Sequence, residues 1–338
     1  MGKEPELRQG PPWAMEEMIF SQAALPERIS RSKDARHLGS RIEAAAEAGE
    51  PVLFTGCGTS EHAARAAAAI VKEALPAARV SAVDAFEARL LPRSSGLVVA
   101  ISHEGETEST ITSAVASAES GAESFLITAK PELTPETVRP VPVPELDRAW
   151  CHTVAYMSPL LTIALPLGLD PGLAASVIES GLDSRGDRAD DAARLAGCEW
   201  LLAVGSGVDE VNAREFALKV AEGAHVPATP LGSEKVLHGH LVAADQRAGL
   251  ILLRFDPQNE AARARQGEKV RAAAEVLGMP VVELSADGTG SRAEALIAGA
   301  VAVQLLTLEL CMRLGTNPDL TRREQPLYRQ AAEAGGVG

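Results

Sequence analysis

The sequence contains 338 residues, of which 46 are Asp or Glu and 32 are Lys or Arg, so its formal net charge is −14. This length predicts about two domains, and a hydrophobic fraction of 46% excludes an intrinsically disordered chain. The acidic balance argues against unspecific binding to nucleic acid or to an anionic membrane, since both need clustered Lys and Arg. Only 3% of the residues are aromatic, so we expect cores of Ala, Val and Leu in which helices pack closely on a sheet.

The first 45 or so residues read as helices that precede the first domain. Residues 1–12 carry charges and prolines but no apolar segment, so we expect no secretory signal and a cytoplasmic protein. The cysteines are widely spaced and form no CxxC pair, which argues against a disulfide framework or a Cys-ligated zinc site. They are Cys57, Cys151, Cys198 and Cys311.

A first candidate binding loop lies within residues 53–71, which read as a short apolar strand, a glycine-rich turn and an Ala-rich helix. The glycines let the backbone approach an anion, and the helix N-terminus points free N–H groups at it. A plain strand-to-helix turn with a capping hydroxyl is the alternative interpretation of this segment. It is not a complete dinucleotide-binding fingerprint, because Glu61 occupies the position of the third glycine. The candidate contacts are Cys57, Thr59 and Ser60.

A second candidate loop follows a predicted strand at residues 97–102 and reads SHEGET. Ser102, Thr107 and the loop amides form another cradle of small residues, and His103 and Glu104 lie between them. The alternative is a solvated loop with a capping threonine. Two such cradles on one sheet are more informative than either alone.

Three further segments complete the first half of the chain. Residues 125–128 predict another buried strand. Residues 158–169 are the most apolar stretch, but they are too few to span a bilayer, so we predict a buried helix. The polar, charged residues 184–191 are the best candidate for a linker.

The same order of elements then recurs. The offsets are 149 residues between Gly56 and Gly205, 153 between Gly96 and Gly249, and 156 between Glu123 and Met279. We therefore predict an α/β protein with two copies of one unit, each a doubly wound parallel sheet flanked by helices. Ligands bind beyond the carboxyl ends of such strands. The predicted boundaries are a helical segment at 1–45, domains at 46–183 and 192–316, and a weakly structured tail at 317–338.

A third signal lies in residues 217–240, which contain three of the chain's seven histidines. Lys219 and Glu222 are three residues apart on one helix face. A carboxylate and an imidazole, such as that of His238, can together move protons near neutral pH. A metal site is the rival interpretation, but no HExxH or two-His-carboxylate spacing is present, and a polar surface helix with incidental histidines is another. We expect no metal and no other cofactor.

These features together resemble the sugar isomerase (SIS) domain proteins. The resemblance rests on GCGTS, SHEGET, the ALKVAE…HGH stretch, the tail GTNPD and the tandem copies, and it covers nearly the whole chain. Within this family, the chain resembles the isomerase half of glucosamine-6-phosphate synthase and its deaminase and ketose-isomerase relatives. The resemblance implies two tandem SIS domains, a sugar or sugar phosphate as the small-molecule partner, and a homodimer with shared active sites.

The resemblance also implies a role for each matching residue. Glu222 would shuttle a proton between C1 and C2 of the open-chain sugar, with Lys219 as the helix lysine beside it. His238, 16 positions further on, would open the sugar ring. The hydroxyls expected to hold the phosphate are those of Thr59, Ser60, Ser102 and Thr107.

The departures from the family pattern narrow the reaction. Glu104 stands where a phosphate-contacting serine is expected, and His152 replaces another serine. No lysine follows Lys269, so imine catalysis from the tail is not expected. A glutaminase half has no counterpart in the sequence, which leaves isomerisation or deamination of a hexose or amino-hexose phosphate. The alternatives are a sugar-phosphate-binding protein without catalysis and an isomerase of an unphosphorylated sugar.

Overall fold

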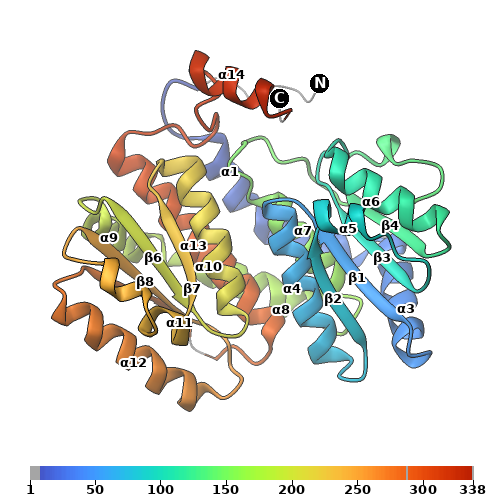
Figure 1. Cartoon of the computed structure of the whole chain (residues 1–338), viewed down its shortest axis with the longest axis horizontal. Helices are drawn as coiled ribbons and strands as arrows, with labels where there is room; N and C mark the ends of the chain where they lie inside the picture. Colours follow the sequence, from blue (N-terminus) through green and yellow to red (C-terminus); the bar gives the residue numbers. More distant parts are fainter. Residues whose placement is uncertain (1–7, 287, 337–338) are drawn as a thin grey trace.

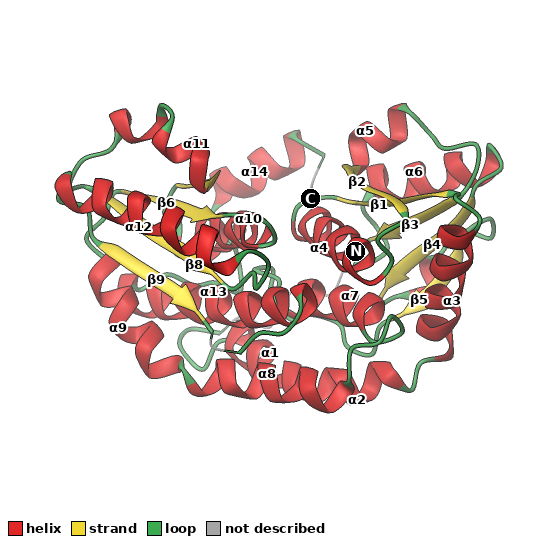
Figure 2. Cartoon of the chain, turned by 90° about the horizontal axis from the view of Figure 1, so that it is seen from below, coloured by secondary structure: helices red, strands yellow, loops and turns green. Residues whose placement is uncertain are grey.

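Two parallel β-sheets stand next to each other, and helices cover both faces of each (Figures 1 and 2). The arrangement is that of a computed structural model, which describes residues 8–286 and 288–336. The prediction of an α/β fold with parallel sheets flanked by helices is confirmed.

The first sheet has the strand order β2-β1-β3-β4-β5, with every pair parallel. Its inner strands are buried along almost their whole length because helices lie on both sides, which explains their continuous apolar runs. The strands are β1 (Pro51–Gly56), β2 (Arg79–Asp84), β3 (Leu97–Ile101), β4 (Glu123–Thr128) and β5 (Arg139–Pro142). The helices around it are α3 (Lys33–Glu47), α4 (Thr59–Ala74), α5 (Ala85–Leu90), α6 (Glu108–Glu119), η2 (Pro131–Leu133) and α7 (Val154–Ala164).

The second sheet has the order β7-β6-β8-β9 and is also parallel, so its strands follow the same pattern as β2-β1-β3-β4. The strands are β6 (Trp200–Gly205), β7 (Ala228–Gly232), β8 (Ala248–Arg254) and β9 (Val281–Ser285). The helical elements are α9 (Arg185–Leu195), α10 (Asp209–Lys219), the π-helical turn η3 (Val220–Ala224), α11 (Ser233–Leu237), η4 (His240–Ala243), α12 (Glu260–Val276) and α13 (Arg292–Leu314).

Four helices lie between the two sheets and join the halves. α4 contacts α7, α10 and α13, and α13 also contacts α7 and α10. α13 is long and apolar enough to cross a membrane by length and composition alone, but 89% of its apolar window is buried inside the protein. It is therefore the core helix of both halves, apolar all round because neighbours cover every side.

The two ends of the described chain lie close to each other. The N-terminal helices are α1 (Ala14–Ser21), η1 (Gln22–Ala24) and α2 (Leu25–Ser30), and α8 (Pro171–Asp183) packs against the latter two. Asp319 is buried and its carboxylate accepts the backbone N–H groups of Ala14 and Met15 at 2.7 and 2.8 Å. The exposed helix α14 (Pro326–Ala334) follows, drawn in red at the top of Figure 1.

Two polar segments contain more regular structure than their composition suggests. The candidate linker, residues 184–191, is helical, because α9 begins at Arg185 and buries Ala192 and Leu195 against α13. The spacing of its apolar residues gives this charged segment one buried face. The tail, residues 317–338, also contains more structure than its sequence predicts. Asp319 accepts hydrogen bonds from the start of α1, and residues 326–334 are helical.

Candidate active site

The turn after β1 brings the first candidate loop against the start of α4. A side chain at Gly56 would place its Cβ 2.7 Å from backbone atoms of Ser60, so only glycine allows this close approach. Thr110 Oγ1 donates to Cys57 Sγ at 3.7 Å and ties this turn to α6. Burial raises the pKa of the Cys57 thiol, which therefore stays protonated near neutral pH.

The second candidate loop follows β3 and is held by its own hydroxyls and by Lys130. Ser102 is buried, and its Oγ donates to Thr107 Oγ1 at 3.4 Å. Glu104 Oε2 and Glu106 Oε1 each lie 3.8 Å from Lys130 Nζ. The carboxylate that stands in place of a serine therefore has a cationic partner from the loop after β4.

His103 is the buried residue of this loop, and its ring is neutral. Its Nε2 accepts the backbone N–H of Asp147 at 2.8 Å, so the hydrogen of the ring is on Nδ1. Burial lowers the pKa of His103 to about 4, and His152, whose ring centroid lies 5.8 Å away, acts in the same direction. Burial also lowers the pKa of His152 to about 3, helped by the cations of Lys219 and Arg323.

The segment around His152 connects this loop to the second half. The Asp147 carboxylate accepts the N–H groups of Thr153 and Ala155 at 2.6 and 3.2 Å, which fixes the course of the chain. Cys151 Sγ donates to the backbone carbonyl of Lys219 at 3.5 Å. The loop after β3, the 147–155 segment and the end of α10 are thus one continuous site.

A buried ion-pair cluster lies at the end of α10. Lys219 Nζ is 2.5 Å from Glu222 Oε2 and 3.9 Å from Glu215 Oε1. Burial opposes the charge of Lys219, but the two carboxylates outweigh it and raise the pKa of Lys219 above its ordinary value. Burial raises the pKa of Glu222, while Lys219 acts against that rise.

The turn η3 that carries Glu222 depends on a glycine. A Cβ on Gly223 would lie 3.0 Å from Cys311 Sγ and 3.4 Å from Cys151 Sγ. A larger residue would press on Cys311 Sγ and on Pro318 Cβ, at 3.3 Å, so the turn that carries Glu222 has no room for a side chain at this position. The predicted pairing of Lys219 with Glu222 thus has a tertiary support that their spacing does not reveal.

The cluster also joins the two halves of the molecule. Glu215 Oε2 lies 2.7 Å from Nδ1 of His62, and Thr59 Oγ1 donates to Glu215 Oε1 at 3.5 Å. Thr59 and His62 belong to α4, so Thr59, expected to hold an anion, instead points at a buried carboxylate. The sequence analysis missed Glu215, His62 and Asp147. The spacing of Glu215 four residues before Lys219 was an available signal for the first; nothing in the local sequence pointed to the other two.

His238 lies apart from this cluster. Its side chain is 73% exposed, and it follows the surface helix α11, where its Nε2 lies 3.0 Å from Glu234 Oε1. Among residues 8–286 and 288–336, no hydrogen bond or ion pair joins His238 to Glu222. One chain alone does not bring the two predicted catalytic groups into contact.

In the second sheet, a carboxylate binds the backbone N–H groups that follow strand β8. Asp209, at the repeat position of Ser60, accepts the N–H groups of Phe255 and Asp256 at 3.0 and 3.1 Å. Burial raises the pKa of Asp209 to about 6. A polar cavity of about 270 Å³ remains there, lined among others by Arg254. An external anion would have to displace Asp209 to reach these amides.

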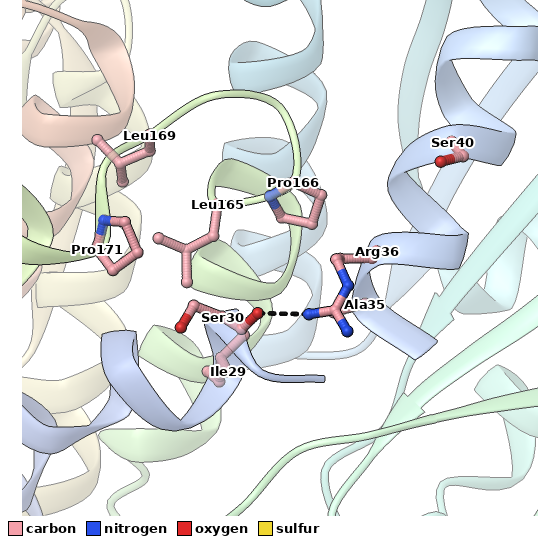
Figure 3. A pocket seen from close by; sticks show the side chains of 9 residues that line it. All are labelled: Ile29, Ser30, Ala35, Arg36, Ser40, Leu165, Pro166, Leu169 and Pro171. Atoms are coloured by element: carbon pink, nitrogen blue, oxygen red, sulfur yellow. Dashed lines mark hydrogen bonds between the residues drawn. The ribbon is translucent and has the colours of Figure 1, made fainter. Parts of the chain in front are cut away.

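A separate cavity of about 320 Å³ lies between α2, α3 and the chain after α7 (Figure 3). Its walls include Ile29, Leu165 and Pro166, and Arg36 donates to the backbone carbonyl of Ser30 at its edge. It shares no residue with the loops described above. Within the described part of the chain, no three His, Cys, Asp or Glu side chains are placed to share a metal ion.

Residues 47–134 match the SIS domain. This SIS segment contains both candidate loops, from β1 to the turn after β4. No curated protein gives a significant match.

Several solved structures share the fold of nearly the whole chain. The C-terminal domain of glucosamine-fructose-6-phosphate aminotransferase from Francisella tularensis has a TM-score of 0.72 at 20% identity, covering 93% of this chain and 99% of that one. Glucosamine-6-phosphate deaminase from Thermotoga maritima has a TM-score of 0.71 at 17% identity, covering 91% and 97%. Tagatose-6-phosphate ketose/aldose isomerase from Escherichia coli has a TM-score of 0.72 at 17% identity, covering 91% and 95%. At these identities the likeness concerns the fold alone.

The ion-pair cluster lies outside the matched SIS segment. Glu215, Lys219 and Glu222 belong to the second half, whereas their partners Thr59 and His62 are inside the segment. The candidate active site therefore lies between the SIS segment and the second sheet.

Proposed function

We propose that this protein is a sugar isomerase that moves a proton between C1 and C2 of an open-chain hexose or amino-hexose. The observation that carries the proposal is the 2.5 Å ion pair between Lys219 and Glu222. The side chain of Glu222 is 29% exposed, whereas those of Lys219 and Glu215 are fully buried. A catalytic base must touch its substrate, so Glu222 takes that role.

The proton transfer follows from the environment of Glu222. Its carboxylate accepts the C2 proton of the aldose to give an enediolate, the proton of the O2 hydroxyl passes to O1, and the same carboxyl group returns its proton to C1 to give the ketose. With an amino-hexose the second step leaves an imine at C2, which water hydrolyses to the ketose and ammonia. Burial raises the pKa of Glu222 toward neutral pH, where a general base is most effective, and Lys219 keeps it ionised.

Sugar chemistry is supported by the proteins of the same fold. Two of the solved structures are named as an amino-sugar-phosphate deaminase and as a ketose/aldose isomerase. With this function we propose that residues 192–316 are a second SIS domain after the first at 46–183. Ser60, Ser102 and Thr107 would bind the sugar, close to His103 and His152. The sequence predicts a hexose or amino-hexose phosphate as the substrate, with an unphosphorylated sugar as the alternative.

We also propose that ring opening needs a second copy of the chain. His238 is exposed and unconnected to Glu222 within one chain, so in a homodimer it would act in the active site of the other protomer. The proposal thereby keeps both predicted catalytic residues and explains their separation.

The first test is the substitution Glu222→Gln, which keeps the size of the side chain and removes the base. We expect turnover to fall at least about 100-fold, the usual contribution of a general base, while thermal unfolding stays cooperative. The assay is a panel of hexoses, amino-hexoses and their 6-phosphates, with detection of ketose and ammonia. Glu179→Gln on the exposed surface of α8 is the matched control.

Full activity in Glu222→Gln would overturn the assignment of the base. Binding of a sugar by the unaltered protein without any product would replace the proposed enzyme with a non-catalytic sugar-binding protein.

A further inference from the structure

The loop after β3 carries two carboxylates, and their charge bears on the substrate of the proposed isomerase. Glu104 and Glu106 share one cation, Lys130, at 3.8 Å each. One ammonium group balances one carboxylate, so the three side chains carry a net charge of −1. The side chains of Glu104 and Glu106 are 30% and 40% exposed, so both carboxylates are accessible from solvent.

Two arginines of the helices around the first sheet have acidic partners of their own. Arg65 pairs with Glu61 at 2.6 Å on α4, and Arg89 pairs with Glu108 at 3.3 Å where α6 begins. Arg323 stacks on the ring of Trp150, with its guanidinium carbon 4.2 Å from the centroid, and keeps its charge, which helps to lower the pKa of His152. The helix N-terminus of α6 would favour an anion, but the two glutamates in front of it oppose one.

His103, the histidine of this loop, supplies no positive charge to it. Its side chain is 5% exposed, and Nδ1 has no hydrogen-bond partner among the described residues although it carries the hydrogen. Because burial holds the pKa of His103 at about 4, the ring is uncharged at neutral pH. The ring therefore adds no positive charge beside the loop that could attract a phosphate.

We propose that the end of the sugar bound by residues 102–107 carries free hydroxyl groups instead of a phosphate, so that the substrate is an unphosphorylated hexose or amino-hexose. Carboxylates accept strong hydrogen bonds from hydroxyl groups, and they repel the charge of a phosphate dianion. This inference rests on the proposed isomerase function, whose substrate class it specifies.

The test compares each hexose and amino-hexose with its 6-phosphate. We expect kcat/KM of the unaltered enzyme to be at least about tenfold higher for the unphosphorylated sugar, which corresponds to about 1.4 kcal/mol. The double substitution Glu104→Gln/Glu106→Gln should raise kcat/KM for the phosphates by about tenfold and lower it for the free sugars. Glu132→Gln/Glu136→Gln removes the same charge from the exposed chain after β4 and should change neither value more than twofold.

Calorimetry on Glu222→Gln measures the affinity for glucosamine and for glucosamine 6-phosphate without turnover. Comparing these affinities with the turnover of the unaltered enzyme distinguishes a failure of the substrate inference from a failure of the isomerase proposal. A preference for the phosphate in turnover would overturn the inference and leave the isomerase function standing. Binding of free glucosamine without turnover by the unaltered enzyme would support the inference and count against the isomerase. Binding and turnover of neither class would overturn both.

Discussion

Lys219 is fully buried, and carboxylates on both sides of it in the sequence balance its charge. Glu222 lies at 2.5 Å and Glu215 at 3.9 Å, and His62 in turn bonds to Glu215. Glu215 therefore has both His62 and Lys219 as partners, and the shorter of the two contacts of Lys219 is the one to Glu222. Removing the cation takes away the ion-pair partner of the partly exposed Glu222 and one partner of the buried Glu215, and breaking such a pair typically costs about 3–5 kcal/mol.

Lys219→Met should therefore alter both activity and stability. The base acts only when ionised, so activity falls as the pH falls through the pKa of Glu222. Lys219 lowers that pKa, and its loss should move the acid limb of kcat/KM to higher pH. A pH–rate profile measures the shift, and urea unfolding should give a loss of about 3–5 kcal/mol.

The exposed Lys33→Met is the control for this substitution. Its free energy of unfolding should stay within about 0.5 kcal/mol of the unaltered value. An acid limb that does not move in Lys219→Met would show that Lys219 does not act on the base.

At the scale of elements, α1 depends on a residue far along the chain. Trp13 precedes the helix and makes no side-chain cap bond, so the first N–H groups of α1 need another acceptor. Asp319 supplies it from the tail, with bonds to Ala14 and Met15. The helix α9 shows the same principle, since its apolar face exists in the sequence but is buried only against α13.

Asp319→Ala should destabilise the protein by about 1–3 kcal/mol, because two buried N–H groups lose their acceptor. Equilibrium unfolding in urea is the measurement. Asp183→Ala on the exposed end of α8 should change the free energy of unfolding by less than about 0.5 kcal/mol. Equal effects of the two substitutions would show that the cap contributes nothing.

At the scale of the whole molecule, the ion-pair cluster of Glu215, Lys219 and Glu222 depends on both halves being in place. α4 contributes Thr59 and His62, and α10 contributes Glu215, Lys219 and the start of the turn to Glu222. The cluster lies in the helical layer between the sheets. A single chain assembles the proposed base, and the proposed homodimer adds the residue that opens the sugar ring.

Mixed dimers test this arrangement. Glu222→Gln and His238→Ala should each be inactive alone, and chains mixed after unfolding and refolding together should recover about a quarter of the activity. Half of the dimers are then hybrids, and one of their two sites combines an intact Glu222 with an intact His238. No recovery, with dimers present by light scattering, would contradict shared sites.

The two candidate loops and the Lys219–Glu222 pair were predictable from the sequence because local patterns specify them. Apolar runs ending in GCGTS and SHEGET place these letters at the carboxyl ends of parallel strands, as observed for β1 and β3. A spacing of three residues places Lys219 and Glu222 side by side on one helical surface. The proposed roles of Ser60, Ser102 and Thr107 in sugar binding remain predictions.

The contacts that give the site its chemistry are decided only by the tertiary structure. His62 and Glu215 are 153 residues apart and meet where α4 packs on α10, and Lys130 reaches Glu104 from the loop of the neighbouring strand. Composition and charge had already indicated an acidic α/β protein with about two domains. Local sequence determines where a strand or helix begins and which face is apolar, but the partner of a buried charge depends on which faces pack together.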